Sequence, residues 1–183
     1  DAGGLRFRRG QLAHALLQHL PDLPPDARAA AARRYLSRPG TGLDESAAAV
    51  LAAEILAILD QPALAPLFAP GSRAEVPLAG VVTGPDGIAS VVGGLVDRLV
   101  VLPDRVLVAD YKTNRQAPAT AKAAPLAYLR QMAAYREVLR GIFPGRPVVC
   151  TLVWTSGPRV MPLPDSLLDT HLPWHAAPAS PAA

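Results

Sequence analysis

The sequence predicts an α/β domain in which a mixed sheet is flanked by helices and preceded by a helical segment. Helical spacing of apolar residues dominates residues 1–70, whereas Val- and Leu-rich runs typical of strands dominate residues 71–163. With 183 residues, half of them apolar, the chain is long enough to bury a full hydrophobic core. Residues 1–163 are therefore expected to form one domain, and the Pro- and Ala-rich residues 164–183 a loosely held tail.

The helical segment contains three helix patterns. A leucine stripe marks residues 10–20, a basic Ala-rich run marks 26–37, and a strongly apolar run marks 45–59. Pro or Gly residues follow each run and predict where the helices end. A short helical turn is expected before residue 70.

The remaining elements alternate in a way that favours a mixed sheet. Three strands are expected first, then a helix, then an apolar strand and a short edge strand. The ranges are 73–82, 88–102 and 105–112 for the first strands, 125–141 for the helix, and 147–154 and 159–163 for the last two strands.

Composition excludes several classes of protein. The single cysteine, Cys150, rules out a disulfide framework and any cysteine-ligated zinc or iron–sulfur cluster within the chain. The net charge of +3 is too small to indicate a polyanion partner by itself. No apolar run is long enough for a membrane span, and no signal peptide or phosphate-binding loop is present. These features indicate a cytoplasmic domain, and the first residue, Asp1, suggests a piece of a longer protein.

Three charged residues are expected to converge on the hairpin around residues 103–104. Pairing that runs symmetrically about this turn places Asp97 opposite Asp110, with Cβ atoms roughly 4.5–5.5 Å apart. Lys112 follows Asp110 by two residues and so projects to the same face. The sequence therefore predicts a patch of two carboxylates and one lysine on an otherwise apolar hairpin.

Two adjacent carboxylates repel each other unless they are paired, protonated or bound to metal. A hard divalent cation such as Mg²⁺ or Mn²⁺ would satisfy both through oxygen ligands. The alternative is an outward, solvated charged face. Both strands are apolar on both faces, so the functional interpretation is favoured.

Four motifs in these elements resemble the RecB-like branch of the PD-(D/E)xK nuclease superfamily, whose restriction-endonuclease-like core has a mixed central sheet. The branch has the patterns G-x-x-D-R, D-Y-K-T and Q-x-x-x-Y, preceded by a helical histidine. In this chain they fall in the same order, at residues 94–99, 108–113, 131–135 and 10–14. The resemblance extends from about residue 5 to residue 163.

The resemblance implies a role for each site residue. Asp97 and Asp110 would bind Mg²⁺ or Mn²⁺ together with His14 and the backbone carbonyl of Tyr111. Lys112 would orient or help to deprotonate the attacking water and offset charge on the phosphate. On the residues alone, His14 and His19 lie equally close to the leucine stripe, and only the resemblance selects His14.

Further residues are assigned more loosely. Glu75 matches a commonly acidic position, although a surface charge on an edge strand explains it equally well. Gln131 and Tyr135 lie one helical turn apart and share a face that lines the DNA path in this branch. Phosphate contacts without base recognition are expected from residues near the active face, unless these are plain surface charges: they are Arg115, Lys122 and Arg130.

Several relatives in this branch carry a group of cysteines around the nuclease core for an iron–sulfur cluster, and this chain has only Cys150. The resemblance is therefore closer to the carboxy-terminal nuclease domain of AddA-type or RecB helicase–nucleases. That implies an Mg²⁺- or Mn²⁺-dependent deoxyribonuclease of double-strand-break repair in bacteria. Its substrate would be single-stranded DNA fed by a helicase region of the same parent chain, beside an AddB-like partner subunit. Three alternatives remain: a non-catalytic DNA-binding or docking module on this fold, a stand-alone exonuclease, and an unrelated metal hydrolase.

Overall fold

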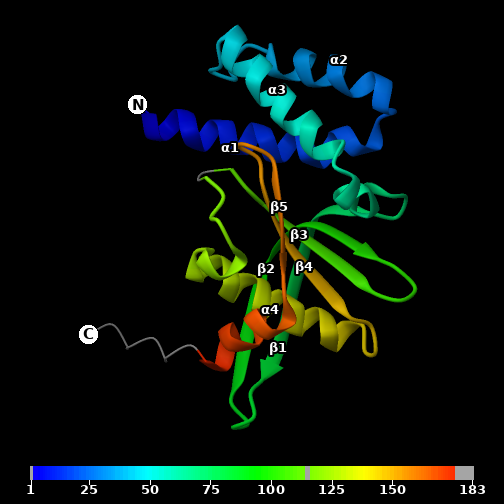
Figure 1. Ribbon diagram of the computed structural model, residues 1–183, viewed down its shortest axis with the longest axis vertical. Helices are drawn as coiled ribbons and strands as arrows, with labels where there is room; N and C mark the ends of the chain where they lie inside the picture. The colour runs from blue at the N-terminus through cyan, green and yellow to red at the C-terminus, as the bar shows by residue number, and fades with distance from the viewer. Residues whose placement is uncertain (1, 114–115, 176–183) are drawn as a thin grey trace.

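The structure is a computed structural model that describes residues 2–113 and 116–175. A five-stranded sheet in the order β1-β2-β3-β4-β5 forms its centre (Figure 1). The strands are β1 (Arg73–Thr83), β2 (Ala89–Val101), β3 (Val106–Lys112), β4 (Val148–Trp154) and β5 (Arg159–Leu163). The longer helices are α1 (Ala2–His19), α2 (Pro25–Leu36), α3 (Glu45–Leu59) and α4 (Leu126–Ile142).

The sheet is mixed, as predicted. Strands β3 and β4 pair in parallel, because α4 carries the chain between them, and all other neighbours pair antiparallel. β5 is the edge strand that the sequence predicted. The α/β fold class is therefore confirmed.

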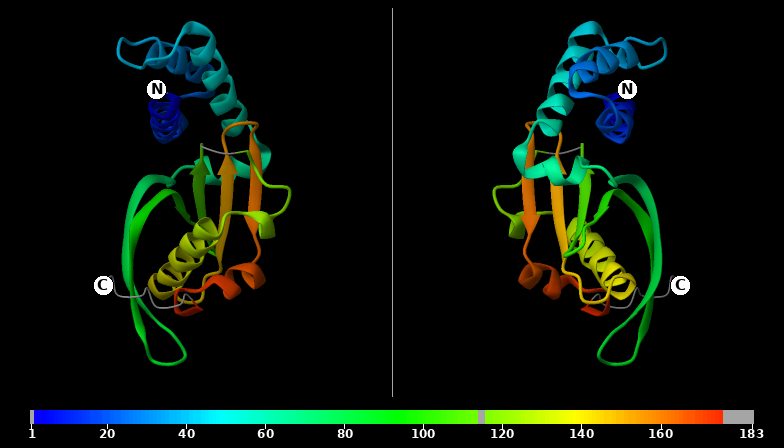
Figure 2. Two further views of the ribbon diagram at one scale, coloured as in Figure 1. Left: turned by 90° about the vertical axis from the view of Figure 1, so that its left-hand side faces the viewer. Right: turned by 90° about the vertical axis from the view of Figure 1, so that its right-hand side faces the viewer.

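Two hydrophobic cores lie on opposite sides of the sheet. On one side α4 packs against β1 to β5, and the long β1–β2 hairpin curves around it (Figure 2). On the other side the side chains of Ala109, Tyr111 and Val153 join a core formed by α1, α2, α3 and the 3-10 turn η2 (Pro62–Phe68). Successive residues of β3 thus serve different cores, as strand alternation requires.

Helix α1 begins at Ala2, earlier than the predicted start at residue 10. Residues 3–8 are exposed, so they carry no apolar stripe that could have revealed the helix. This extension matters because it lies over the site described below.

Within the predicted tail, residues 164–175 are packed more closely than the sequence predicted, and residues 176–183 lie outside the described residues. Helix α5 (Asp165–Leu168) and the turns η4 (Asp169–His171) and η5 (Pro173–His175) follow β5 directly. Leu168 is fully buried in the α4 core. The buried Arg136 guanidinium of α4 donates to Asp165 at 2.9 Å and also pairs with Asp169. A buried charge needs partners such as these two carboxylates, and no local sequence pattern predicts which residues they are.

Cys150 is buried on β4, where burial raises the pKa of its thiol to about 12. This agrees with its interpretation as a small core residue. Within the described chain no single helix is long and apolar enough to cross a membrane; α3 and η2 pass that test only as a pair bent by 85°.

We predict that Leu168→Ala lowers the free energy of unfolding by about 2–5 kcal/mol, because it empties a fully buried position in the α4 core. The matched control is Leu126→Ala, since Leu126 lies on α4 with 49% of its surface exposed. Urea titration of both variants measures the difference. Equal, small effects would show that residues 165–168 do not belong to the folded domain.

Candidate active site

The site is built at a fork where β2 leaves β3. Pairing between these strands ends at Arg98 and Ala109, and this register, continued by one residue, places Asp97 opposite Asp110 as predicted. Instead of continuing the ladder, Asp97 accepts the backbone N–H of Tyr111 on its Oδ2, at 2.6 Å. The carboxylate thus replaces a backbone acceptor, and the two strands separate.

The neighbouring strand β1 is distorted at the same row. Glu75 lies between the pairs Ala74–Arg98 and Val76–Val96, so it stands across from Asp97. Its φ of 51° is in the left-handed region, which is strained for a residue with a Cβ. Strand alternation also breaks here, since Val96 and Leu99, three residues apart, both face the α4 core.

Helix α1 presents His14 to these two carboxylates. Its Nδ1 lies 3.5 Å from Asp97 Oδ1 and 3.9 Å from Glu75 Oε1. The imidazole meets the Tyr111 ring edge-on, with centroids 5.9 Å apart. His19, at the other end of the same helix, is exposed. The structure therefore separates the two histidines that the sequence pattern left equivalent.

The donor set fits a hard divalent cation. One ligand atom from each of His14, Glu75 and Asp97 lies within 4.8 Å of the others. The two carboxylates are the oxygen ligands that Mg²⁺ and Mn²⁺ prefer, and the imidazole adds one nitrogen ligand. The Tyr111 N–H points to Asp97. Because the N–H and C=O of one strand residue leave on the same side, the Tyr111 carbonyl faces this group too.

Asp97 is the strongly perturbed acid of the site. Burial raises its pKa to about 7, and the negative charges of Asp110 and Glu75 act in the same direction. The hydrogen bond from Tyr111 and the charge of Lys112 oppose the rise. The metal-free site therefore keeps a proton on Asp97 to higher pH than an ordinary carboxyl does.

Lys112 is held by contacts on three sides. Its ammonium forms an ion pair with Asp110 and donates to Gln131 Oε1 at 3.2 Å. It also lies over the Tyr128 ring, 3.8 Å from the centroid. With 9% of its surface exposed, Lys112 has little freedom to leave this position.

A chain of hydrogen bonds fixes the position of Gln131 and, through it, of Lys112. Gln131 Nε2 donates to the Tyr135 hydroxyl at 3.2 Å, which in turn donates to the Leu95 carbonyl of β2 at 3.4 Å. Gly94 allows this approach, because a Cβ there would overlap the Tyr135 hydroxyl. The glycine of the G-x-x-D run and the tyrosine of the Q-x-x-x-Y run thus make one contact.

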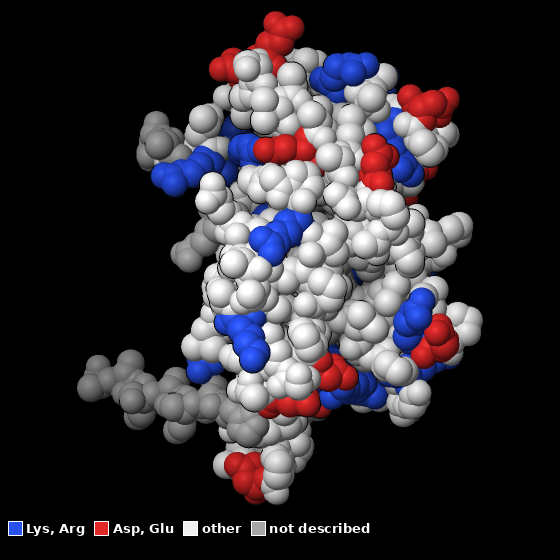
Figure 3. Space-filling model, in the orientation of Figure 1, with Lys and Arg blue, Asp and Glu red and all other residues white. Residues whose placement is uncertain are grey.

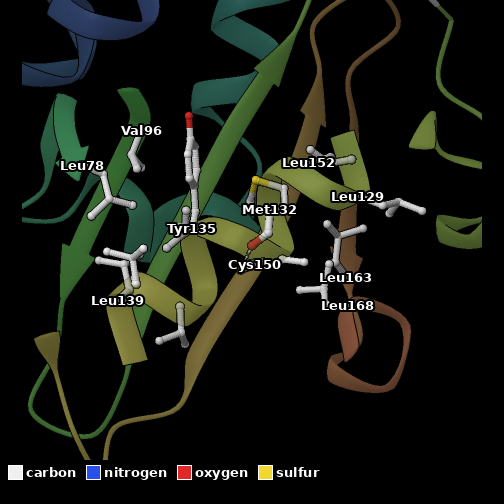
Figure 4. Packing of buried hydrophobic residues seen from close by; sticks show 14 of the residues in the cluster. Leu78, Val96, Leu129, Met132, Tyr135, Leu139, Cys150, Leu152, Leu163 and Leu168 are labelled. Atoms are coloured by element: carbon white, nitrogen blue, oxygen red, sulfur yellow. Dashed lines mark hydrogen bonds between the residues drawn. The ribbon is translucent and has the colours of Figure 1, made fainter. Parts of the chain in front are cut away.

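The expectation that Gln131 and Tyr135 line a DNA path together needs correction. Gln131 borders the cleft, but Tyr135 is 5% exposed and stands in the α4 core beside Val96 (Figure 4). Only its hydroxyl reaches polar groups. Tyr135 therefore positions Gln131 and does not face a ligand.

The site opens into a cleft of about 710 Å³ between α1, α4 and the fork. Its lining includes Asp97, Asp110 and Lys112, with Arg6 and Tyr128 as residues that the sequence analysis missed. Arg6, Gly10 and His14 recur at spacings of four, so one helix face carries all three. This spacing relative to His14 could have identified Arg6 as a site residue from the sequence.

The predicted phosphate-binding residues do not gather in this cleft. Lys122 lines a separate hollow with Thr120 and Ser166. Arg130 is exposed on α4 and is not among the residues that line the cleft. Arg115 lies outside the described residues. Among the described cations, Arg6 and Lys112 border the cleft instead.

Arg98, next to Asp97, anchors the helix that carries His14. It is 2% exposed and donates to the carbonyls of Leu17 and Gln18, in the last turn of α1. A second donor reaches Ser72 Oγ at 3.3 Å. Carbonyls at a helix C-terminus lack helical partners, so a cation is favourable there. Consecutive residues of β2 thus provide one acid of the site and fix the helix that provides the histidine.

Comparison of the sequence with known protein families identifies the family of the chain. The chain belongs to the PD-(D/E)XK nuclease superfamily, whose sequence pattern matches residues 2–154. No curated protein matches the chain. Among solved structures, the crystal structure of SSO0001 is similar with 14% identity over 88% of this chain and 80% of that one, at a TM-score of 0.34.

We predict that Asp97→Asn raises the Tm of the metal-free protein at pH 8 and removes any increase caused by Mg²⁺. The folded-state pKa of about 7 exceeds the unfolded value near 3.9, so the folded state binds the extra proton between these values. This contribution to stability is full at low pH and is lost as pH rises through 7.

Thermal melts in EDTA at pH 5 to 8 measure that slope, and asparagine keeps an acceptor for the Tyr111 N–H. The same proton competes with metal, so Mg²⁺ affinity of the wild type should increase as pH rises through 7. A metal affinity that does not change over this range would contradict the assignment of Asp97 as a ligand.

We predict that Arg98→Met weakens Mn²⁺ binding about tenfold through His14, as loss of an outer support does. Calorimetric titration of Arg98→Met, His14→Ala and the double variant forms a thermodynamic cycle. If Arg98 acts by holding α1, its effect disappears in the His14→Ala background. Additive losses would show that Arg98 merely stabilises the fold.

Proposed function

We propose that this protein is an Mg²⁺- or Mn²⁺-dependent deoxyribonuclease domain that hydrolyses phosphodiester bonds. One observation carries the proposal: acids from β2 and β3, a histidine from α1 and an oriented lysine border one cleft, and a third acid, Glu75 of β1, lies beside the histidine. Membership of a nuclease superfamily also supports the proposal of nuclease activity.

In this proposal His14, Glu75, Asp97 and Asp110, with the Tyr111 carbonyl, hold the cation. The bound cation would offset charge on the scissile phosphate and favour ionisation of the attacking water. Asp97 must be ionised to take part, and a bound cation would favour its ionised form, against the burial that raises its pKa in the metal-free site. His14, adjacent to both Asp97 and Glu75, keeps its Nδ1 directed at them.

Lys112 is proposed as the group that acts on the reacting atoms. Its ammonium can donate a hydrogen bond to the attacking water or to a phosphate oxygen, where negative charge develops. Gln131 and Tyr128 fix its direction, and Tyr135 fixes Gln131. Because these contacts exist before substrate binds, little reorganisation is required at the moment of reaction.

The finer proposals concern the biological setting. We propose a substrate of single-stranded DNA, delivered by a helicase region of the same parent chain during double-strand-break repair in the bacterial cytoplasm. An AddB-like subunit would be the partner. The motif order supports this setting, as does Cys150, the only cysteine, which leaves no ligands for an iron–sulfur cluster within this chain.

We predict that Lys112→Met and Asp110→Asn each reduce cleavage by about 10²–10⁴-fold, the range for loss of a proton-transfer or charge-stabilising group. The assay follows an end-labelled single strand with Mg²⁺ or Mn²⁺. Lys122→Met is the matched control for Lys112→Met, because it removes the same charge from a residue that lies in a separate hollow.

Thermal melts of the three variants establish that each is folded. Cleavage that survives in both Lys112→Met and Asp110→Asn would refute the proposed roles. Metal-independent DNA binding by a wild type that never cleaves would favour the alternative of a DNA-binding module on this fold.

A further inference from the structure

A second hollow adjoins the cleft across helix α1. It has a volume of about 410 Å³ and lies between α1 and the turn that joins α2 to α3. Gln11 lines both spaces. Gln11 precedes His14 by three residues, about one helical turn. A linear ligand in the cleft can therefore enter the hollow without leaving the protein surface.

The hollow combines cations with an aromatic ring. The Arg38 guanidinium lies over the Tyr35 ring, 5.3 Å from its centroid. Arg8 donates to the Gly40 carbonyl across the hollow, which holds its guanidinium at the rim. Leu12 forms an apolar floor. None of the described residues that line this hollow is acidic.

This composition matches the chemistry of a single nucleic-acid strand. Arginines compensate phosphate charge, and aromatic or guanidinium planes stack on unpaired bases. Basic side chains also gather over the N-terminal part of α1, at the upper left of Figure 3. A strand running from Lys112 past Arg6 to Arg38 meets cations throughout.

The geometry points to a strand-binding subsite in which Arg8 and Arg38 contact phosphates and Tyr35 contacts a base of single-stranded DNA. The nucleotides it holds lie outside the reacting bond and keep the strand in register with the cleft. This inference deepens the proposed function and rests on it for the position of the scissile phosphate.

Variants of Arg38 test the subsite directly. Arg38 is exposed, and its described side-chain contact is with the Tyr35 ring, so Arg38→Gln should fold normally. Arg33→Gln is the matched control: Arg33 is an exposed arginine of α2 that lines a different hollow. The two variants have the same net charge.

Binding of fluorescent oligo(dT) of increasing length is measured in EDTA over a series of salt concentrations. Arg38→Gln should raise Kd about tenfold for long strands, the effect of losing one charged contact. It should also reduce the slope of log K against log salt by about 0.7, as one lost phosphate contact predicts. Tyr35→Leu should weaken binding about tenfold, whereas Tyr35→Phe retains the ring.

Cleavage assays with a small substrate and with long DNA test the subsite and the proposed nuclease activity separately. Bis(p-nitrophenyl) phosphate is too small to extend from the cleft into the hollow, so Arg38→Gln should cleave it at the same rate as the wild type. On long DNA, the kcat/KM of Arg38→Gln should fall about tenfold. If wild type cleaves both and Arg38→Gln equals Arg33→Gln in binding and cleavage, the subsite is refuted and the nuclease stands. If wild type cleaves neither, the nuclease proposal fails, and the binding series alone supports or refutes the subsite.

Discussion

The fork between β2 and β3 depends on one hydrogen bond, from the Tyr111 N–H to the Asp97 carboxylate at 2.6 Å. A buried amide left without an acceptor is costly, so two strands cannot separate inside a protein unless something replaces the lost ladder. Here a side chain of the departing strand is the replacement. The same carboxylate then has its second oxygen directed at His14, which couples strand geometry to the chemistry of the site.

Helix α1 is consequently a part of the site and not an appendage to the sheet. Arg98 holds its last turn, and near its middle Gly10 comes so close to Thr113 that a Cβ would lie 2.8 Å from the threonine hydroxyl. One side of the helix borders the cleft and another borders the hollow with Tyr35 and Arg38. The helical segment therefore forms part of the wall of both the cleft and the hollow.

Predictions from the sequence succeeded where the determining interactions are local. The hairpin register followed from a short turn, and the contact of Lys112 with Asp110 followed from strand alternation. They failed where an element gives no periodic signal, as at the exposed start of α1. They also failed for Tyr135, because spacing on a helix shows which residues share a face but not whether that face meets solvent or a core.

The sequence by itself determined the acids and the lysine of β2 and β3, because adjacent strands joined by a short turn have only one symmetrical register. The residues alone left His14 and His19 equivalent, and the tertiary structure placed His14 beside Asp97, brought Glu75 across from Asp97, and gave Arg98 its partners on α1. Those residues come from elements far apart in the chain. Their relative positions are set by how whole apolar faces pack, which is a property of many side chains together and not of any short motif.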